Sequence, residues 1–289
     1  MKAIQSVFHR LFAEPSVLQK LFAERGASNG RVSFLSAEEV DLFRVNGYVV
    51  KRGVLDPEKM ARARDYMWSK MPPTFDPESW TTWSGTVEDY KGPHTIADTL
   101  GRVKLRGEAR ELPFLLDLLP RNPVVFGVAE QLLGRGSVAA PKRIRGIYCT
   151  FPLPDSGLPP VPGHLDLHPY HLGVTAYLDQ VLECGGAFTV WPGSHRAVFL
   201  HFKTLLANEA EDSLQGELNR LEGKAGVEIL GGAGDVVFWH HRLLHAASRN
   251  RGRTVRQAVL CDFSRKDADH SGRIPSSRGL WTSWDGVSE

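Results

Sequence analysis

Cysteine is scarce in this chain of 289 residues: Cys149, Cys184 and Cys261 are widely spaced, and none belongs to a C-x-x-C pair. This argues against a disulfide framework and a cysteine-based zinc site, and it favours a reducing compartment, so we expect a cytoplasmic protein. The sequence contains no apolar run of the ~18 to 20 residues that a membrane span needs. It also begins without the apolar core and cleavage site of a secretory signal.

An excess of charge of one sign is also missing. The net charge is +2, which is too small to suggest a nucleic-acid partner. With 42% hydrophobic and 24% charged residues, the composition is that of an ordinary globular protein with one sizeable core. We therefore expect no nucleic-acid partner, and a monomer and a homodimer both remain open.

Residues 1–25 place apolar side chains at helical spacing on both sides of Pro15, which predicts two short amphipathic helices. These helices either pack on the body or on a second subunit, make a peripheral contact with a membrane, or form a targeting segment. The segment "RGASNGR" then forms a flexible joint. We expect residues 1–30 to be an extension and residues 31–289 to form a single domain.

Local signals define the first helices of that domain. Ser36 and Glu39 form a capping box that opens a helix ending near Gly47. Asp56 is an N-cap candidate, and Pro57 suits the first position of a helix that runs to about residue 70. Further expected elements are a strand over "YVVKRGV", loops over 74–108, a helical region over 113–133 broken at Pro120 and Pro123, and loops over 153–163.

From about residue 142 to 264 the pattern changes to short segments rich in β-branched and aromatic residues. These segments are "RIRGIYCTF", "GVTAYLD", "GAFTVWP", "GVEIL", "DVVFWH" and "RQAVLCDF", bounded by Gly, Pro and Asp. Many short strands with turn signals predict a sandwich or barrel, and the polar insert at about 202–223 is expected to be helical. The fold class is therefore mainly β with flanking helices.

The stretch "PGHLDLHPYH" raises the question of a metal site, because His164 and Asp166 are two residues apart. On a strand both would point to one face, about 6 to 7 Å apart, although a histidine-rich surface loop has the same look. A third ligand must come from elsewhere, and a second cluster offers His240, His241 and, next to a turn, His245. Arg256 lies symmetrically to His245 about the turn "RNRGR", so the chain returns this arginine to about the level of that histidine.

Two histidines and one carboxylate leave three positions of a metal open. Non-haem Fe(II) enzymes use that arrangement to hold a co-substrate and O₂ together, whereas structural zinc sites want four ligands. An arginine beside such a site offers a planar, permanently charged fork for a carboxylate.

With these residues in view, the sequence resembles the phytanoyl-CoA dioxygenase family of Fe(II)/2-oxoglutarate oxygenases. The resemblance runs from about Leu35 to Phe263, and its pieces occur in the family's order. They are "LSAEEVDLFRVNGYVV", "HLD", "LDQVLECGGAFTVWPGSHR" and "LLHAASRNRGRTVRQAVLCDF". The resemblance implies a double-stranded β-helix, or jelly roll, in which His245 and Arg256 point inward from different sheets.

The resemblance also implies roles for single residues. His164, Asp166 and His245 would bind Fe(II), and Arg256 would bind the distal carboxylate of 2-oxoglutarate. Further candidates for co-substrate contacts are Ser248, Thr175, Arg145 and Thr150, and candidates for the substrate mouth are His168, His171 and Trp239. Gly185 and Ala247 depart from the family pattern, because polar side chains are usual at both places.

The implied reaction consumes O₂ and 2-oxoglutarate, releases succinate and CO₂, and hydroxylates a C–H bond of a small-molecule or lipid-type substrate. Desaturation or demethylation would need only a different substrate pose. Two other classes stay open: a cupin-like hydrolase or isomerase that uses zinc or manganese, and a non-catalytic metal-binding jelly-roll protein.

Overall fold

The computed structural model describes residues 33–83, 95–97, 101–153, 161–166, 168, 170–206, 211–268 and 279–287. The predicted extension over 1–30 lies outside the described residues, as does most of the loop expected over 153–163. Within the described ranges no single helix is long and apolar enough to cross a membrane. Only the bent pair Gly107–Leu118 and Pro123–Leu133 reaches that length and composition, across an angle of 93°.

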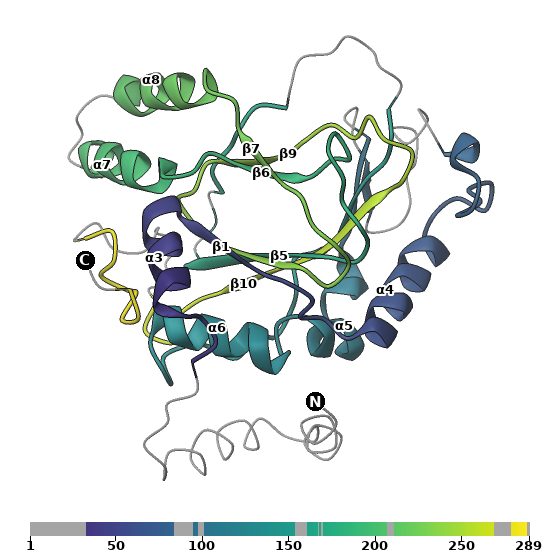
Figure 1. Cartoon of the computed structure of the whole chain (residues 1–289), viewed down its shortest axis with the longest axis horizontal. Coiled ribbons are helices and arrows are strands. Elements are labelled where there is room, and N and C mark those ends of the chain that lie inside the picture. Colours follow the sequence, from purple (N-terminus) through teal and green to yellow (C-terminus); the bar gives the residue numbers. More distant parts are fainter. Residues whose placement is uncertain are drawn as a thin grey trace.

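Two antiparallel sheets face each other across the molecule (Figure 1). The larger sheet has seven strands in the order β1-β8-β5-β10-β4-β3-β2, and the smaller has three in the order β7-β6-β9. The strands are β1 Tyr48–Lys51, β2 Thr95–Ala97, β3 Arg102–Leu105, β4 Gly146–Thr150, β5 Leu172–Tyr177, β6 Phe188–Val190, β7 Val227–Ile229, β8 Val236–His240, β9 His245–Ala247 and β10 Arg256–Phe263. This arrangement is a jelly roll, as the resemblance implied.

Helices α5 and α6 lie beneath the larger sheet in Figure 1, whereas α7 and α8 lie beside the smaller sheet. The helices are α3 Ala37–Asn46, α4 Pro57–Ser69, α5 Pro113–Leu118, α6 Pro123–Leu133, α7 Ser194–Leu206 and α8 Glu211–Glu222. The predicted caps are confirmed: the Ser36 hydroxyl accepts from the Glu39 amide at 3.2 Å, and Asp56 accepts from the Lys59 amide at 3.0 Å. Gly47 ends α3 with φ 80°, a left-handed conformation that glycine adopts without steric cost.

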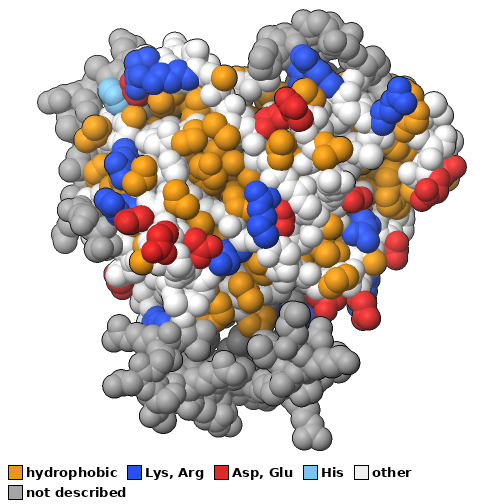
Figure 2. Space-filling view, in the orientation of Figure 1, with side chains coloured by type: hydrophobic (Ala, Val, Ile, Leu, Met, Phe, Trp, Pro, Cys, Tyr) orange, Lys and Arg blue, Asp and Glu red, His pale blue; other side chains and the backbone are white. Residues whose placement is uncertain are grey.

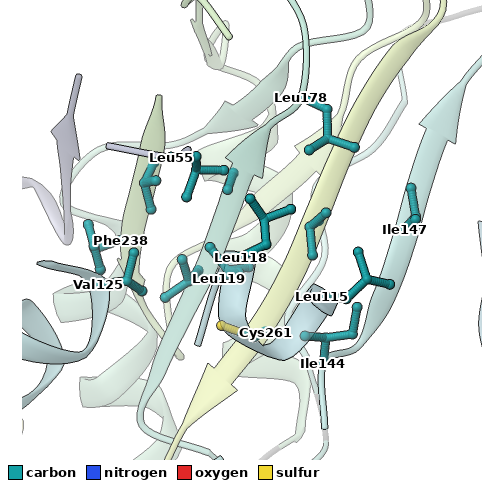
Figure 3. Close-up of a cluster of buried hydrophobic side chains, with 14 of the residues drawn as sticks. Leu55, Leu115, Leu118, Leu119, Val125, Ile144, Ile147, Leu178, Phe238 and Cys261 are labelled. Carbon is teal, nitrogen blue, oxygen red and sulfur yellow. The ribbon is translucent and has the colours of Figure 1, made fainter. Parts of the chain in front are cut away.

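Strand alternation divides the core into two layers. On β10, Val259, Cys261 and Phe263 point outward to the helices, whereas Ala258 and Leu260 point between the sheets. Figure 3 shows part of the outer layer, which contains Cys261 of β10 together with Leu115 and Leu118 of α5. Because both faces of the central strands are covered, their sequences are apolar almost throughout. The polar side chains of the site lie against this inner layer.

One expectation about secondary structure was wrong, and a second was right only in part. The region 74–108 was expected to be loop, but β3 pairs with β4 and extends the larger sheet. The insert expected at about 202–223 is helical, as predicted, but its first helix α7 begins at Ser194 rather than near residue 202.

Candidate metal centre

His164, Asp166 and His245 come together between the sheets. The backbones of His164 and His245 form a two-way bridge, with N···O distances of 2.9 and 3.2 Å, which places their rings side by side with centroids 4.5 Å apart. One potential ligand atom from each of the three residues lies within 4.8 Å of the others. This spacing lets one metal ion contact two imidazoles and one carboxylate.

The tautomer of His245 is set by its backbone. Its Nδ1 lies 2.9 Å from the Leu243 carbonyl oxygen, and because a carbonyl can only accept, Nδ1 must carry the hydrogen. Nε2 then keeps its lone pair and lies 3.7 Å from Asp166 Oδ2. Burial, with a smaller contribution from His164, lowers the pKa of His245 to about 4, so the ring is neutral at pH 7. A neutral ring with one nitrogen held by a carbonyl is the usual form of a histidine ligand.

Asp166 is held in place by two side chains. Arg145 Nη1 donates to Asp166 Oδ2 at 2.7 Å, and the Tyr170 hydroxyl donates to the same oxygen at 2.9 Å. Burial opposes ionisation, but the Arg145 guanidinium, together with His245 and Tyr170, holds the pKa of the Asp166 carboxyl well below its usual range. The carboxylate is therefore charged and oriented.

Arg145 is itself fixed from several sides. Its Nε donates to Asp262 at 2.7 Å, and its guanidinium lies 4.7 Å from the Tyr170 ring centroid and 5.3 Å from that of Trp239. The Trp239 ring in turn lies 4.2 Å from the His245 ring, centroid to centroid. Gly173 leaves room for the Trp239 ring in this position, since a Cβ at residue 173 would come within 2.3 Å of the Trp239 indole.

The three ligand candidates open into a cavity of about 590 Å³ that also contains Arg256. Arg256 Nε donates to the Gly186 carbonyl at 2.8 Å and Nη1 to the Tyr148 carbonyl at 3.2 Å, which orients the guanidinium. Thr150 lies beside Arg256 on the neighbouring strand, and Thr175 also lines the cavity. Both hydroxyls are buried and, within the described ranges, have no hydrogen-bond partner. A cavity with a fixed guanidinium and two unpaired hydroxyls suits a ligand with oxygen atoms.

The local symmetry that placed Arg256 opposite His245 in one hairpin was misleading. β9 pairs with β6 in the smaller sheet, and β10 pairs with β4 and β5 in the larger one. The two residues reach the cavity from different sheets, as the resemblance implied.

The remaining candidates fall into two groups. His168 and Trp239 line the cavity; His168 Nε2 lies 3.0 Å from Asp262, and its ring stacks on Tyr170. Ser248 and His171 do not line it. The Ser248 hydroxyl lies 2.5 Å from that of Thr189, and His171 is buried against His241. Asp262 was not identified from the sequence, although "LCDF" places this acid on the strand next to Arg145, and neither was the Tyr170 hydroxyl, which belongs to a buried side chain.

Comparison with known proteins identifies the fold. The fold is shared with the non-haem alpha-ketoglutarate-dependent epimerase SnoN of nogalamycin biosynthesis, at a TM-score of 0.54 and 18% identity over 78% of this chain and 82% of that one. EctD from S. alaskensis, whose structure contains 2-oxoglutarate and 5-hydroxyectoine, aligns at a TM-score of 0.51 and 16% identity over 82% of this chain and 78% of that one. The jelly roll is thus the one used by 2-oxoglutarate-dependent enzymes.

The family itself is defined by sequence. The model of the phytanoyl-CoA dioxygenase family matches residues 43–258, and the chain belongs to this family of iron- and 2-oxoglutarate-dependent oxygenases. Human peroxisomal phytanoyl-CoA dioxygenase is 29% identical over 127 residues, which make up 40% of this chain and 38% of the human enzyme. The chain therefore matches well under half of that relative's length.

Proposed function

We propose that His164, Asp166 and His245 hold Fe(II), that Arg256 binds the distal carboxylate of 2-oxoglutarate, and that the enzyme hydroxylates a C–H bond of a small molecule. One O₂ and one 2-oxoglutarate are consumed, one oxygen atom enters the substrate, and succinate and CO₂ are released. The observation that carries this proposal is the convergence of three ligand atoms within 4.8 Å beside a buried, oriented arginine.

The donor set fits iron. Two neutral imidazoles and one charged carboxylate are the ligands that non-haem Fe(II) oxygenases use, and they leave positions open for other molecules. Bound iron supplies the oxygen chemistry, and the protein supplies orientation and a closed environment. Trp239 and Tyr170 shield the ligands from one side, which limits the access of water to the centre.

The candidate residues for 2-oxoglutarate binding differ in whether other side chains already occupy them. Arg256 offers a planar fork, and the unpaired hydroxyls of Thr150 and Thr175 offer further donors for carboxylate oxygens. Arg145 is occupied by Asp166 and Asp262 instead. We therefore assign Arg145 to positioning the Asp166 carboxylate rather than to binding 2-oxoglutarate.

The proposal is tested by 2-oxoglutarate turnover in the purified full-length chain. With Fe(II) and air we expect succinate to form even without the true substrate, and we expect none without iron or oxygen. His245→Ala and Arg256→Gln should abolish succinate formation at low co-substrate concentration. Arg251→Gln is the matched control, because this exposed arginine does not line the cavity.

The rival classes give different results in the same assay. A zinc or manganese hydrolase would bind metal but leave 2-oxoglutarate unchanged, and its activity would not depend on O₂. A non-catalytic protein would bind metal and form no succinate under any condition. Once a substrate is found, a product that has gained one oxygen atom supports hydroxylation, whereas loss of two hydrogens indicates desaturation.

A further inference from the structure

The cavity wall is strongly cationic. Among its described lining residues are two carboxylates, Asp166 and Asp262, and both are paired with Arg145. The lining cations are Arg102, Lys104, Arg106, Arg110, Lys142, Arg143, Arg145 and Arg256. By contrast, Figure 2 shows acidic and basic side chains interspersed over the visible outer face. The excess of one sign is therefore a property of the cavity, in a chain whose net charge is only +2.

Strand β3 builds part of this wall by simple alternation. In "RVKLR" the apolar residues Val103 and Leu105 are 0% and 3% exposed in the outer core, while Arg102 and Lys104 take the opposite face and line the cavity. Arg106 continues the series just beyond the strand. Its Nη2 donates to the Tyr148 hydroxyl at 2.7 Å, which leaves the guanidinium oriented along the wall.

Two groups of these cations lie toward opposite ends of β4. Arg256 and Arg102 both pair in register with Thr150, so they mark the end that we assign to the co-substrate. Arg106 follows Leu105, which pairs with Ile147 nearer the start of β4, and Arg110, Lys142 and Arg143 belong to the segments next to that start. The four steps along the strand from Thr150 back to Gly146 span about 13 Å at 3.3 Å per residue.

We name Arg106, Arg110, Lys142 and Arg143 the cationic end. Within the described ranges none of the four has a carboxylate partner. Arg106 Nε is buried and has no hydrogen-bond partner there, and Arg110 Nε reaches only the Ile144 carbonyl at 3.3 Å. Lys142 and Arg143 are exposed at the cavity mouth. Four like charges at one end of a cavity repel each other unless an anion lies among them.

We propose that the cationic end binds an oxyanion group, a phosphate or a carboxylate, carried by the substrate. A 2-oxoglutarate molecule held by Arg256 lies at the other end, so these cations serve a different anion. Guanidinium forks pair with phosphate and carboxylate oxygens through two parallel hydrogen bonds, and lysine adds a compact charge. The identification of the bound molecule as the substrate rests on the proposed oxygenase function. The existence of the anion site does not depend on that function.

The test measures the binding of two probes, inorganic pyrophosphate and malonate, to the metal-free full-length chain by titration calorimetry. We expect wild type to bind one of them with a Kd of about 1 mM or lower. Lys142→Glu/Arg143→Glu should weaken binding by about tenfold or more, because charge-assisted hydrogen bonds are lost and repulsion is added. Both positions are exposed, so the fold should tolerate the change. Arg251→Glu changes an exposed charge outside the cavity lining and should leave binding unchanged.

A crossed comparison separates the two ends. Arg256→Gln should retain pyrophosphate or malonate binding but lose 2-oxoglutarate binding in the Mn(II)-loaded protein, and Lys142→Glu/Arg143→Glu should do the reverse. Tighter pyrophosphate binding assigns a phosphate ester, and tighter malonate binding assigns a carboxylate. The proposal is overturned if neither probe binds, or if the double variant binds as wild type does. Failure of 2-oxoglutarate to bind the metal-loaded wild type would instead overturn the proposed function.

Discussion

Arg145→Met gives the sharpest stability prediction, because this substitution removes one cation from between two carboxylates. Arg145 Nη1 contacts Asp166 at 2.7 Å, and Nε contacts Asp262 at 2.7 Å. The side chains of Arg145, Asp166 and Asp262 are 12%, 15% and 21% exposed, so water screens them little. Methionine keeps an apolar stem against Tyr170 and Trp239 but leaves both carboxylates without their counter-charge.

Breaking a buried ion pair by removing one partner costs about 3 to 5 kcal/mol, and we expect about 3 kcal/mol here because the group retains some exposure. Arg145→Met/Asp262→Asn should recover part of that loss, since only one unpaired carboxylate then remains. The ion pair of Arg121 with Asp117 is the matched control: its side chains are 48% and 43% exposed, so Arg121→Met should cost less than about 1 kcal/mol.

Urea unfolding of the metal-free proteins at pH 7.5, followed by tryptophan fluorescence, measures these differences. Metal-free protein is needed because a bound cation would replace part of the missing charge at Asp166. If Arg145→Met cost no more than the Arg121 control, or if removing Asp262 as well destabilised it further, the electrostatic account of this network would be wrong.

Three further predictions concern other parts of the chain. Asp235→Asn should cost about 1 to 3 kcal/mol at pH 7, because the carboxylate accepts from Arg52 and two backbone amides. Burial opposes ionisation, but these partners lower the pKa of Asp235. The difference in unfolding free energy between wild type and Asp235→Asn, measured in urea, should therefore become smaller below about pH 4. Burial lowers the pKa of His195 to about 3 and that of His240 well below its ordinary value, so unfolding favours protonation. Wild-type unfolding free energy should therefore fall below about pH 6.5, by up to about 1.4 kcal/mol per pH unit for each histidine, whereas a flat profile from pH 7.5 to 5.5 would contradict this. If residues 1–25 contact membranes, the full chain should co-sediment with liposomes more than a chain lacking 1–30; equal sedimentation would remove that idea.

Elements specified by short-range chemistry could be predicted from the sequence. In the capping box at Ser36 and the N-cap at Asp56, a side chain accepts a hydrogen bond from the backbone amide three residues later. Such short-range pairs can be recognised directly in the sequence. Most strands of the jelly roll were visible because they have β-branched or aromatic residues between turn signals; these are β1, β4, β5, β6, β7, β8 and β10. The pairing of His164 and Asp166 on one side was visible for a similar reason, since it needs only the two-residue repeat of an extended chain.

The remaining parts depend on contacts between distant segments. β3 reads as loop because three of the five residues in "RVKLR" are cations, and it becomes a strand through pairing with β4. Arg145 appears as a co-substrate candidate in the sequence, but its partner Asp262 lies 117 residues away. Likewise, only the assignment of β9 and β10 to different sheets shows how His245 and Arg256 reach one cavity.

The central claim is that Fe(II) and 2-oxoglutarate meet at His164, Asp166, His245 and Arg256. Its most direct test is the visible spectrum of the metal-stripped protein under anaerobic conditions, after Fe(II) and then 2-oxoglutarate are added. We expect a weak charge-transfer band that needs both additions, disappears in His245→Ala, and requires more 2-oxoglutarate in Arg256→Gln. A wild-type protein that gives no band and has no affinity for 2-oxoglutarate would contradict the account.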